Sequence, residues 1–176
     1  MLEIAITNRH LCKDDYFTQI EKVASRKPFA ILLREKDLGF DKYLALSDEV
    51  ERICAAHGVP LITHTHALPG IPNLHVPFAF ANEELAQKYQ LSVSVHSVEE
   101  ARAAEAMGAQ FVIAGHIFAT GSKPGVPPQG LGFLREICDA VRIPVFAIGG
   151  ITGHNTQQCL DAGAAGICRM SYWMGI

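Results

Sequence analysis

The fold is most readily inferred from the stretch Gln110-Phe-Val-Ile-Ala-Gly-His-Ile-Phe-Ala-Thr-Gly-Ser-Lys-Pro-Gly125. It contains a short apolar run that is followed by an ionisable base. Residues 111–114 include two β-branched side chains and predict a buried strand. The base, His116, comes just after this strand, and a polar loop follows it with Thr120, Ser122 and Lys123. In α/β proteins ligands bind at the carboxyl ends of parallel strands, so we expect this stretch to carry chemistry.

The same alternation of strand and helix runs through the whole chain. Apolar runs predict strands at residues 3–7, 29–34, 60–63, 73–76, 92–95, 111–114, 144–148 and 166–170. Amphipathic periodicity predicts helices at residues 15–25, 42–57, 83–89, 98–107, 131–141 and 155–162. Asp14 is a candidate N-cap for the first helix, and Ser97 with Glu100 has the spacing of a capping box.

This pattern predicts an α/β fold with parallel strands, because βαβ crossovers join the strands and several strands are apolar on both faces. Eight strands indicate a small (β/α)8 TIM barrel, with an open doubly wound sheet as the alternative. We expect one domain over residues 1–176. The chain has no room for a full eighth helix, so Trp173 and Met174, or a second subunit in a homodimer or larger homo-oligomer, would cover the last strand.

The composition argues against several classes of partner. The chain is 49% hydrophobic with a formal net charge of −3, which gives no general attraction to nucleic acid or to an anionic membrane. No apolar run approaches the roughly 18 residues of a membrane span, and the N-terminus resembles a strand without a signal peptide's basic start. Five scattered cysteines without a Cys-x-x-Cys pair predict reduced thiols and a cytoplasmic location.

Basic side chains and histidines follow the predicted strands and indicate a site for an anionic small molecule. They are Arg34, Lys36, His64, His66, His75 and His96, and Ser94 lies among them. Phosphate is the expected anion, because loops after the last two strands of a barrel often bind it. Here those loops carry Gly149 and Gly150, then Met170 and Ser171. The alternative is that the glycine pair only forms a tight turn.

Three of these residues have alternative interpretations. His116 is either an acid/base near neutral pH or a structural histidine bonded to a neighbouring loop. Arg34 either binds ligand or pairs with an acid such as Glu35. His64 and His66 share a strand face, but no acidic residue follows within a dozen positions to complete a metal site, so we expect no metal.

Several motifs together resemble the thiamine phosphate synthase/TenI superfamily. They are Leu33-Arg-Glu-Lys36, Ser92-Val-Ser-Val-His-Ser97, Gly115-His-Ile-Phe-Ala-Thr-Gly-Ser-Lys123, Ile143-Pro-Val-Phe-Ala-Ile-Gly-Gly-Ile151 and Gly163-Ala-Ala-Gly-Ile-Cys-Arg-Met-Ser171. They occur in family order over nearly the whole chain. The resemblance implies a barrel enzyme of thiamine biosynthesis whose partner is a phosphorylated thiazole.

Departures from the synthase pattern favour the TenI branch of this resemblance. The synthases have an Asn-Asp pair after strand 3 and an acidic residue after strand 4, which hold Mg²⁺ and the pyrimidine pyrophosphate. This chain has Thr63-His-Thr-His66 and Leu74-His-Val-Pro-Phe-Ala-Phe80 there. It also has Gly115-His-Ile-Phe118 where synthases usually have Gly-Pro-Ile-Phe.

The TenI resemblance implies a cofactor-free thiazole tautomerase, an isomerase that moves a proton with His116 as acid/base. Ser122 and Lys123 would then cover the heterocycle or bind its carboxylate. Two alternatives stay open. One is thiamine phosphate synthase, a magnesium-dependent coupling of pyrimidine pyrophosphate to thiazole phosphate. The other is a non-catalytic ligand-binding or regulatory relative.

Overall fold

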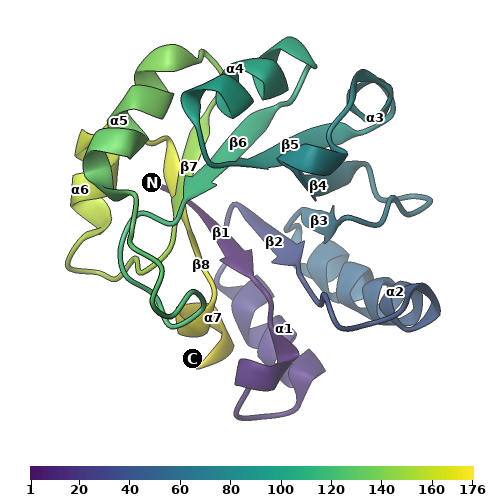
Figure 1. Cartoon of the computed structure of the whole chain (residues 1–176). Helices are drawn as coiled ribbons and strands as arrows, with labels where there is room; N and C mark the ends of the chain where they lie inside the picture. Colours follow the sequence, from purple (N-terminus) through teal and green to yellow (C-terminus); the bar gives the residue numbers. More distant parts are fainter. The chain divides into compact units, whose positions relative to one another are not determined.

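The computed structural model describes residues 1–176, in which short strands alternate with helices (Figure 1). The strands are β1 (Leu2–Ile6), β2 (Ala30–Leu33), β3 (Leu61–His64), β4 (Asn73–Pro77), β5 (Gln90–Val95), β6 (Phe111–Gly115), β7 (Val145–Ile148) and β8 (Gly166–Arg169). The helices are α1 (Tyr16–Ser25), α2 (Phe40–His57), α3 (Glu83–Lys88), α4 (Val98–Ala106), α5 (Gly130–Ala140), α6 (Thr156–Asp161) and α7 (Ser171–Met174). Two 3-10 turns, η1 (Arg9–Leu11) and η2 (Phe78–Phe80), follow β1 and β4.

The eight strands form a closed barrel in chain order, from β1 to β8. This confirms the predicted α/β barrel over the open doubly wound sheet. After β8 the described chain forms α7, a helix of four residues. None of the helices combines the length and apolarity that crossing a bilayer requires.

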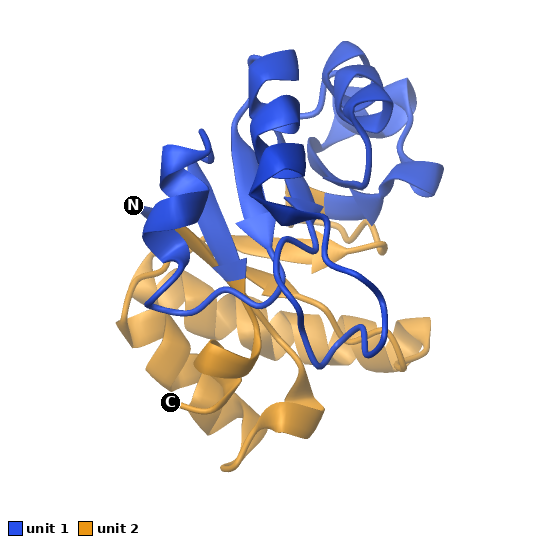
Figure 2. Ribbon diagram, turned by 60° about the vertical axis from the view of Figure 1, so that its left-hand side comes forward, with its two compact units in different colours: residues 1–2, 75–168 blue, residues 3–74, 169–176 orange.

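The chain divides into two compact units (Figure 2). Unit 1 comprises residues 1–2 and 75–168, and unit 2 comprises residues 3–74 and 169–176. Within unit 1, β5, β6, β7 and β8 pair in parallel, as when Ala147 aligns with Ala114 on one side and Ile167 on the other. Within unit 2, β1, β2 and β3 pair in parallel, and Ile31 lies between Ala5 and Leu61. The expectation of one domain over the whole chain stays a prediction.

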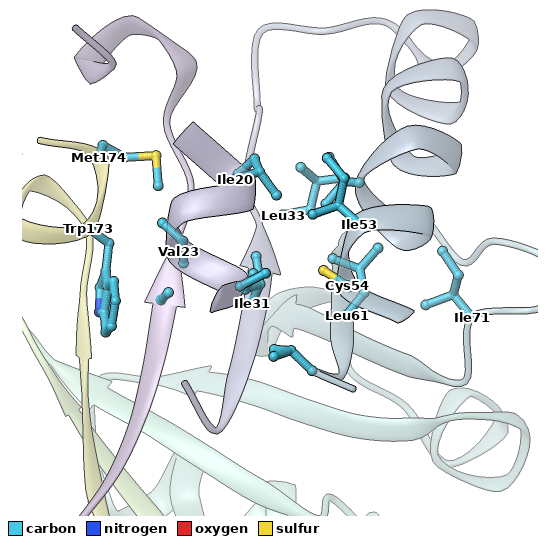
Figure 3. Packing of buried hydrophobic residues seen from close by; sticks show 14 of the residues in the cluster. Ile20, Val23, Ile31, Leu33, Ile53, Cys54, Leu61, Ile71, Trp173 and Met174 are labelled. Carbon is cyan, nitrogen blue, oxygen red and sulfur yellow. The ribbon is translucent and has the colours of Figure 1, made fainter. Parts of the chain in front are cut away.

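The core of unit 2 forms where α1 and α2 bury their apolar sides against the strands (Figure 3). Ile20 of α1 and Ile53 of α2 belong to the same buried cluster as Leu33 of β2. Trp173 and Met174 of α7 also belong to this cluster, at 6% and 0% exposure. The short last helix therefore buries both of the side chains that we expected to replace a missing helix.

The first helix begins one residue later than predicted. Asp15 is its N-cap, and its carboxylate accepts a hydrogen bond of 3.0 Å from the backbone N–H of Thr18. The Asp14 prediction is wrong because that side chain instead pairs with Lys22, at 2.6 Å. Half of the predicted capping box is present: the Ser97 hydroxyl accepts from the N–H of Glu100, but the Glu100 carboxylate accepts from the N–H of His96.

Candidate functional site

The ends of β2 and β3 bring Arg34 and His64 to neighbouring positions in unit 2. Leu33 aligns with Thr63 in the parallel register, so the next residues along the two strands follow side by side. The Tyr43 hydroxyl, from α2, joins the two strand ends. It donates to the carbonyl of Leu33 at 2.7 Å and accepts from the backbone N–H of His64 at 2.8 Å.

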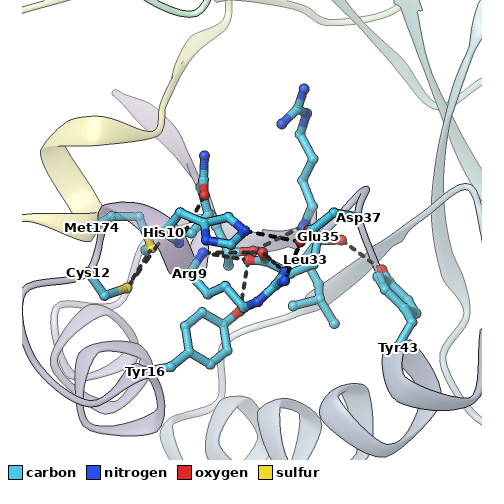
Figure 4. Close-up of polar contacts among 12 residues, drawn as sticks. Arg9, His10, Cys12, Tyr16, Leu33, Glu35, Asp37, Tyr43 and Met174 are labelled. Carbon is cyan, nitrogen blue, oxygen red and sulfur yellow. Dashed lines mark hydrogen bonds and ion pairs between the residues drawn. The ribbon is translucent and has the colours of Figure 1, made fainter. Parts of the chain in front are cut away.

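The carboxylate of Glu35 is buried and fully engaged by groups from the first strand–helix segment (Figure 4). It accepts hydrogen bonds from the Thr7 hydroxyl at 2.7 Å, from the Arg9 backbone N–H at 3.1 Å and from the Tyr16 hydroxyl at 3.3 Å. The Arg9 guanidinium lies 3.2 Å away and neutralises its charge. These groups occupy the Glu35 carboxylate, so the structure does not support the alternative in which Glu35 pairs with Arg34.

The second acidic side chain of this segment, Asp37, is also taken up. It pairs with the Arg9 guanidinium and, at 3.0 Å, with the His10 ring. These hydrogen bonds hold the pKa of Asp37 well below its usual range. Both carboxylates therefore share one guanidinium, that of Arg9.

The groups around His64 are predominantly cationic. Burial, with the positive charges of Lys36, Arg34 and His66, lowers the pKa of His64 to about 4. Burial also lowers the pKa of the half-buried Arg34 guanidinium. Three basic side chains, Arg34, Lys36 and His64, thus share one region of unit 2, which favours an anionic ligand. We call these three residues the cationic cluster.

The Mg²⁺ that the synthase pattern implies does not fit the side chains of this region. Magnesium takes oxygen ligands, chiefly carboxylates and substrate phosphates. β3 ends at His64 and Thr65, while Glu35 and Asp37 are bound to Arg9. His66 packs against the rings of Phe40 and Tyr43, and no group of three or more His, Cys, Asp or Glu residues has metal-ligating geometry.

In unit 1 the glycine pair after β7 packs against the segment that follows β6. A Cβ atom on Gly149 would overlap His116, and one on Gly150 would overlap the carbonyl of Ala119. Both glycines have positive φ, at 103° and 63°. The backbone N–H of Phe118 donates to the carbonyl of Gly149 at 3.0 Å. Close approach between two loops therefore accounts for glycine at both positions.

His116 is buried within its own loop. The residue is 5% exposed, and its ring atom Nε2 lies 3.3 Å from the carbonyl oxygen of Val126. The backbone N–H of Gln129 donates to the His116 carbonyl at 2.9 Å. These contacts support the structural interpretation of this histidine. Its acid/base role stays a prediction.

The remaining predicted loop residues lie toward solvent. Ser122 and Lys123 are exposed and Thr120 is half-buried. A turn closes this tip, because the backbone N–H of Lys123 donates to the carbonyl of Thr120 at 3.1 Å. In unit 2, Ser171 is exposed and Met170 is half-buried. The binding roles predicted for these five residues stay predictions.

A buried histidine between two serines was not predicted as a group. The His75 ring bonds the Ser92 hydroxyl through Nδ1 at 2.9 Å and the Ser94 hydroxyl through Nε2 at 2.7 Å. Ser94 is half-buried and was predicted to bind substrate, whereas Ser92 and the Glu35 partners were missed. The sequence could have indicated Ser92, because it lies two residues before Ser94 and both side chains therefore point to the same face of the strand.

Comparison with known proteins gives consistent names. A family model described as Thiamine monophosphate synthase matches residues 70–172. A relative from Streptococcus pneumoniae named Thiamine-phosphate synthase 2 is 33% identical over 172 residues, covering 92% of this chain and 82% of the relative. One from Aquifex aeolicus, Putative thiamine-phosphate synthase 2, is 30% identical and covers 97% and 96%. The solved structure of a thiamine phosphate pyrophosphorylase from Pyrococcus furiosus matches with a TM-score of 0.86 and 27% identity, covering 99% and 88%.

These relatives overturn the predicted activity. Their names describe synthases, which are transferases, so the predicted thiazole tautomerase and its isomerase class are wrong. The superfamily resemblance itself is confirmed, but the TenI tautomerase branch is not. The prediction of the TenI branch had assigned an acid/base role to His116, which stands where synthases usually have proline.

Proposed function

Because the chain belongs to the thiamine monophosphate synthase family, we propose that it is a transferase that couples a pyrimidine pyrophosphate to a thiazole phosphate. The support comes from relatives that carry the synthase name over most of both chains. In such a coupling a bond forms between the two heterocycles and pyrophosphate leaves. Negative charge builds up on that leaving group, so fixed positive charges beside it would lower the barrier.

The observation that carries the proposal is the juxtaposition of Arg34 and His64 at the ends of β2 and β3. We assign Arg34 and Lys36 to the pyrophosphate, because a guanidinium binds phosphate oxygens through two parallel N–H groups and an ammonium acts as a point charge. The ion pair of Glu35 is with Arg9, at 3.2 Å, so its carboxylate does not bind the Arg34 guanidinium directly.

The other predicted residues have supporting roles in this proposal. Ser94, oriented by His75, would contact the pyrimidine substrate, and Thr120, Ser122 and Lys123 would cover the bound substrates. In unit 1, Gly149 and Gly150 would contact a substrate phosphate, and in unit 2 Met170 and Ser171 keep the same proposed role. We also propose a cytoplasmic location, consistent with five free cysteines, and a homo-oligomeric state as an open expectation.

The proposal is tested by incubating the protein with both substrates, in EDTA and in MgCl₂, and measuring thiamine phosphate by mass spectrometry. We expect product, and we expect Arg34→Ala to lower kcat/KM by about 10–100-fold, the range for losing a charged hydrogen bond. Arg52→Ala is the control, because Arg52 is an exposed cation that pairs with Glu49 on α2. No product in either buffer would reject the synthase activity.

A further inference from the structure

We propose that Arg34, Lys36 and His64 bind a phosphate or pyrophosphate group without a divalent cation, and that His64 takes up a proton as the anion binds. The inference rests on the proposed function only for the identity of the ligand as a phosphate ester. It starts from the disagreement between the magnesium pattern of the synthases and the side chains present here.

The first step is the replacement of oxygen ligands by a base. Where the synthase pattern has an Asn-Asp pair after strand 3, this chain has His64 and Thr65, and the Thr65 hydroxyl lies 2.9 Å from His64 Nδ1. Glu35 and Asp37, the two carboxylates of the Arg34–Lys36 segment and its next residue, both pair with Arg9. A ligand with two or more negative charges therefore meets side chains that themselves supply positive charge.

The second step concerns the charges that face His64 from each neighbouring element. The segment between β2 and α2 contributes Arg34 and Lys36, and the segment after β3 contributes His66. From α2 comes the Tyr43 hydroxyl, whose pKa is raised by burial, so it stays neutral. No acidic side chain is among the groups that shift His64.

The third step is what an anion does to this balance. In the unliganded protein, burial and the neighbouring cations keep His64 neutral near pH 7. An anion bound to Arg34 and Lys36 offsets the repulsion that those cations exert on a protonated imidazole. An opposite charge within about 4–6 Å raises the pKa of a base by about 1–3. Binding and protonation then favour each other, because the two events share one set of charges.

The backbone at His64 is held next to the end of β2. Its N–H donates to the Tyr43 hydroxyl, which itself donates to the Leu33 carbonyl of the neighbouring strand. The imidazole contacts the Thr65 hydroxyl through Nδ1 at 2.9 Å. His64 and Arg34 therefore follow adjacent positions of the β2–β3 register, where one anion can reach both.

The direct test is NMR titration of the histidine ring signals in the whole protein, in EDTA, with and without inorganic pyrophosphate. The His64 signal is identified by its loss in His64→Asn. We expect saturating pyrophosphate to raise the pKa of His64 by about 1–3. Because NMR follows the ring itself, the titration of pyrophosphate does not disturb the reading.

Calorimetry of pyrophosphate binding in EDTA gives the second measurement. We expect binding to tighten as the pH is lowered through the range where His64 is protonated in the complex and neutral in the unliganded protein. Tightening approaches tenfold per pH unit at most, as for the uptake of one proton. Pyrophosphate affinity should change more steeply with pH in the wild-type protein than in His64→Asn. Lys36→Gln, at an exposed position, should weaken binding and raise the pKa of His64 in the unliganded protein.

The outcomes separate this inference from the synthase proposal. Binding that requires Mg²⁺, or a His64 pKa that pyrophosphate leaves unchanged, would overturn the inference even if thiamine phosphate is formed. Pyrophosphate binding in EDTA with the expected pKa change, but without turnover, would support the inference and reject the synthase activity. Arg52→Ala, with its exposed charge on α2, should bind pyrophosphate as the wild type does.

Discussion

The hydroxyl of Tyr43 accepts a 2.8 Å hydrogen bond from the backbone N–H of His64. The same hydroxyl donates to Leu33 at 2.7 Å, so one side chain of α2 fixes the ends of two parallel strands. Arg34 and His64 are held next to each other by this bridge. The position of the charges that we assign to anion binding thus depends on Tyr43, an uncharged residue.

Tyr43→Phe should therefore destabilise the protein and weaken pyrophosphate binding together. The residue is 1% exposed, and its loss of a hydroxyl leaves a carbonyl and an N–H without this partner. Leaving buried polar groups unpaired costs about 1–3 kcal/mol. Urea denaturation would measure the change. Tyr172→Phe is the control at an exposed tyrosine, and equal effects of the two substitutions would contradict the bridging role.

The pH dependence of stability should change when His64 is replaced. The pKa of His64 is lowered from 6.5 to about 4 in the folded protein, so the unfolded chain binds more protons between these values. The free energy of unfolding therefore falls as the pH drops from about 6.5 toward 4, by up to about 3 kcal/mol from this group.

His64→Asn should remove that part of the dependence. The measurement is the urea midpoint at pH 7.0, 5.5 and 4.5 for the wild type, for His64→Asn and for His154→Asn, which replaces an exposed histidine. We expect a shallower pH profile only for His64→Asn. Parallel profiles for all three proteins would show that His64 is not kept neutral by folding.

Glu3 should anchor the C-terminal helix of unit 2. Its carboxylate accepts from Arg169 at 2.5 and 2.8 Å and from the Trp173 ring N–H at 2.6 Å. The side chains of Glu3 and Arg169 are 11% and 13% exposed, so Glu3→Ala leaves the nearly buried Arg169 guanidinium without its carboxylate partner. We expect a loss of about 3 kcal/mol, as for breaking a buried pair.

The emission of the single tryptophan, Trp173, reports this change directly. Glu84→Ala removes the exposed pair with Lys88 and should change the stability much less, since exposed pairs contribute about 0–1 kcal/mol. If Glu3→Ala matched Glu84→Ala, the anchoring role would have to be abandoned.

Gly149→Ala should disturb the loop that contains His116. The added methyl group would overlap the His116 backbone and side chain, and φ at this position is 103°. We expect a destabilisation of about 1–3 kcal/mol from strain and displaced packing, and a changed His116 ring signal in NMR spectra. Gly153→Ala, whose added methyl group would have no neighbouring atom within 4 Å, should leave both readouts unchanged.

Much of the barrel was predictable from local patterns. The run at residues 111–114 became β6, and the candidate capping Ser97 does cap its helix. The first N-cap was misassigned by one residue because both Asp14 and Asp15 satisfy the local rule, and only the partner of each side chain separates them. The activity was misassigned because departures from the synthase motifs, among them His116, were interpreted as those of a tautomerase, whereas relatives that match most of the chain carry the synthase name.

By itself the sequence determined the barrel and its superfamily, because apolar periodicity and short motifs act over a few neighbouring residues. It also placed Arg34, Lys36 and His64 after strands. Only the tertiary structure decided which carboxylates are neutralised, and by which cation, since Glu35 meets Thr7, Arg9 and Tyr16 through strand pairing and helix packing. The physical reason is that a carboxylate is neutralised by the cation nearest in space, and distance along the chain does not say which cation that is.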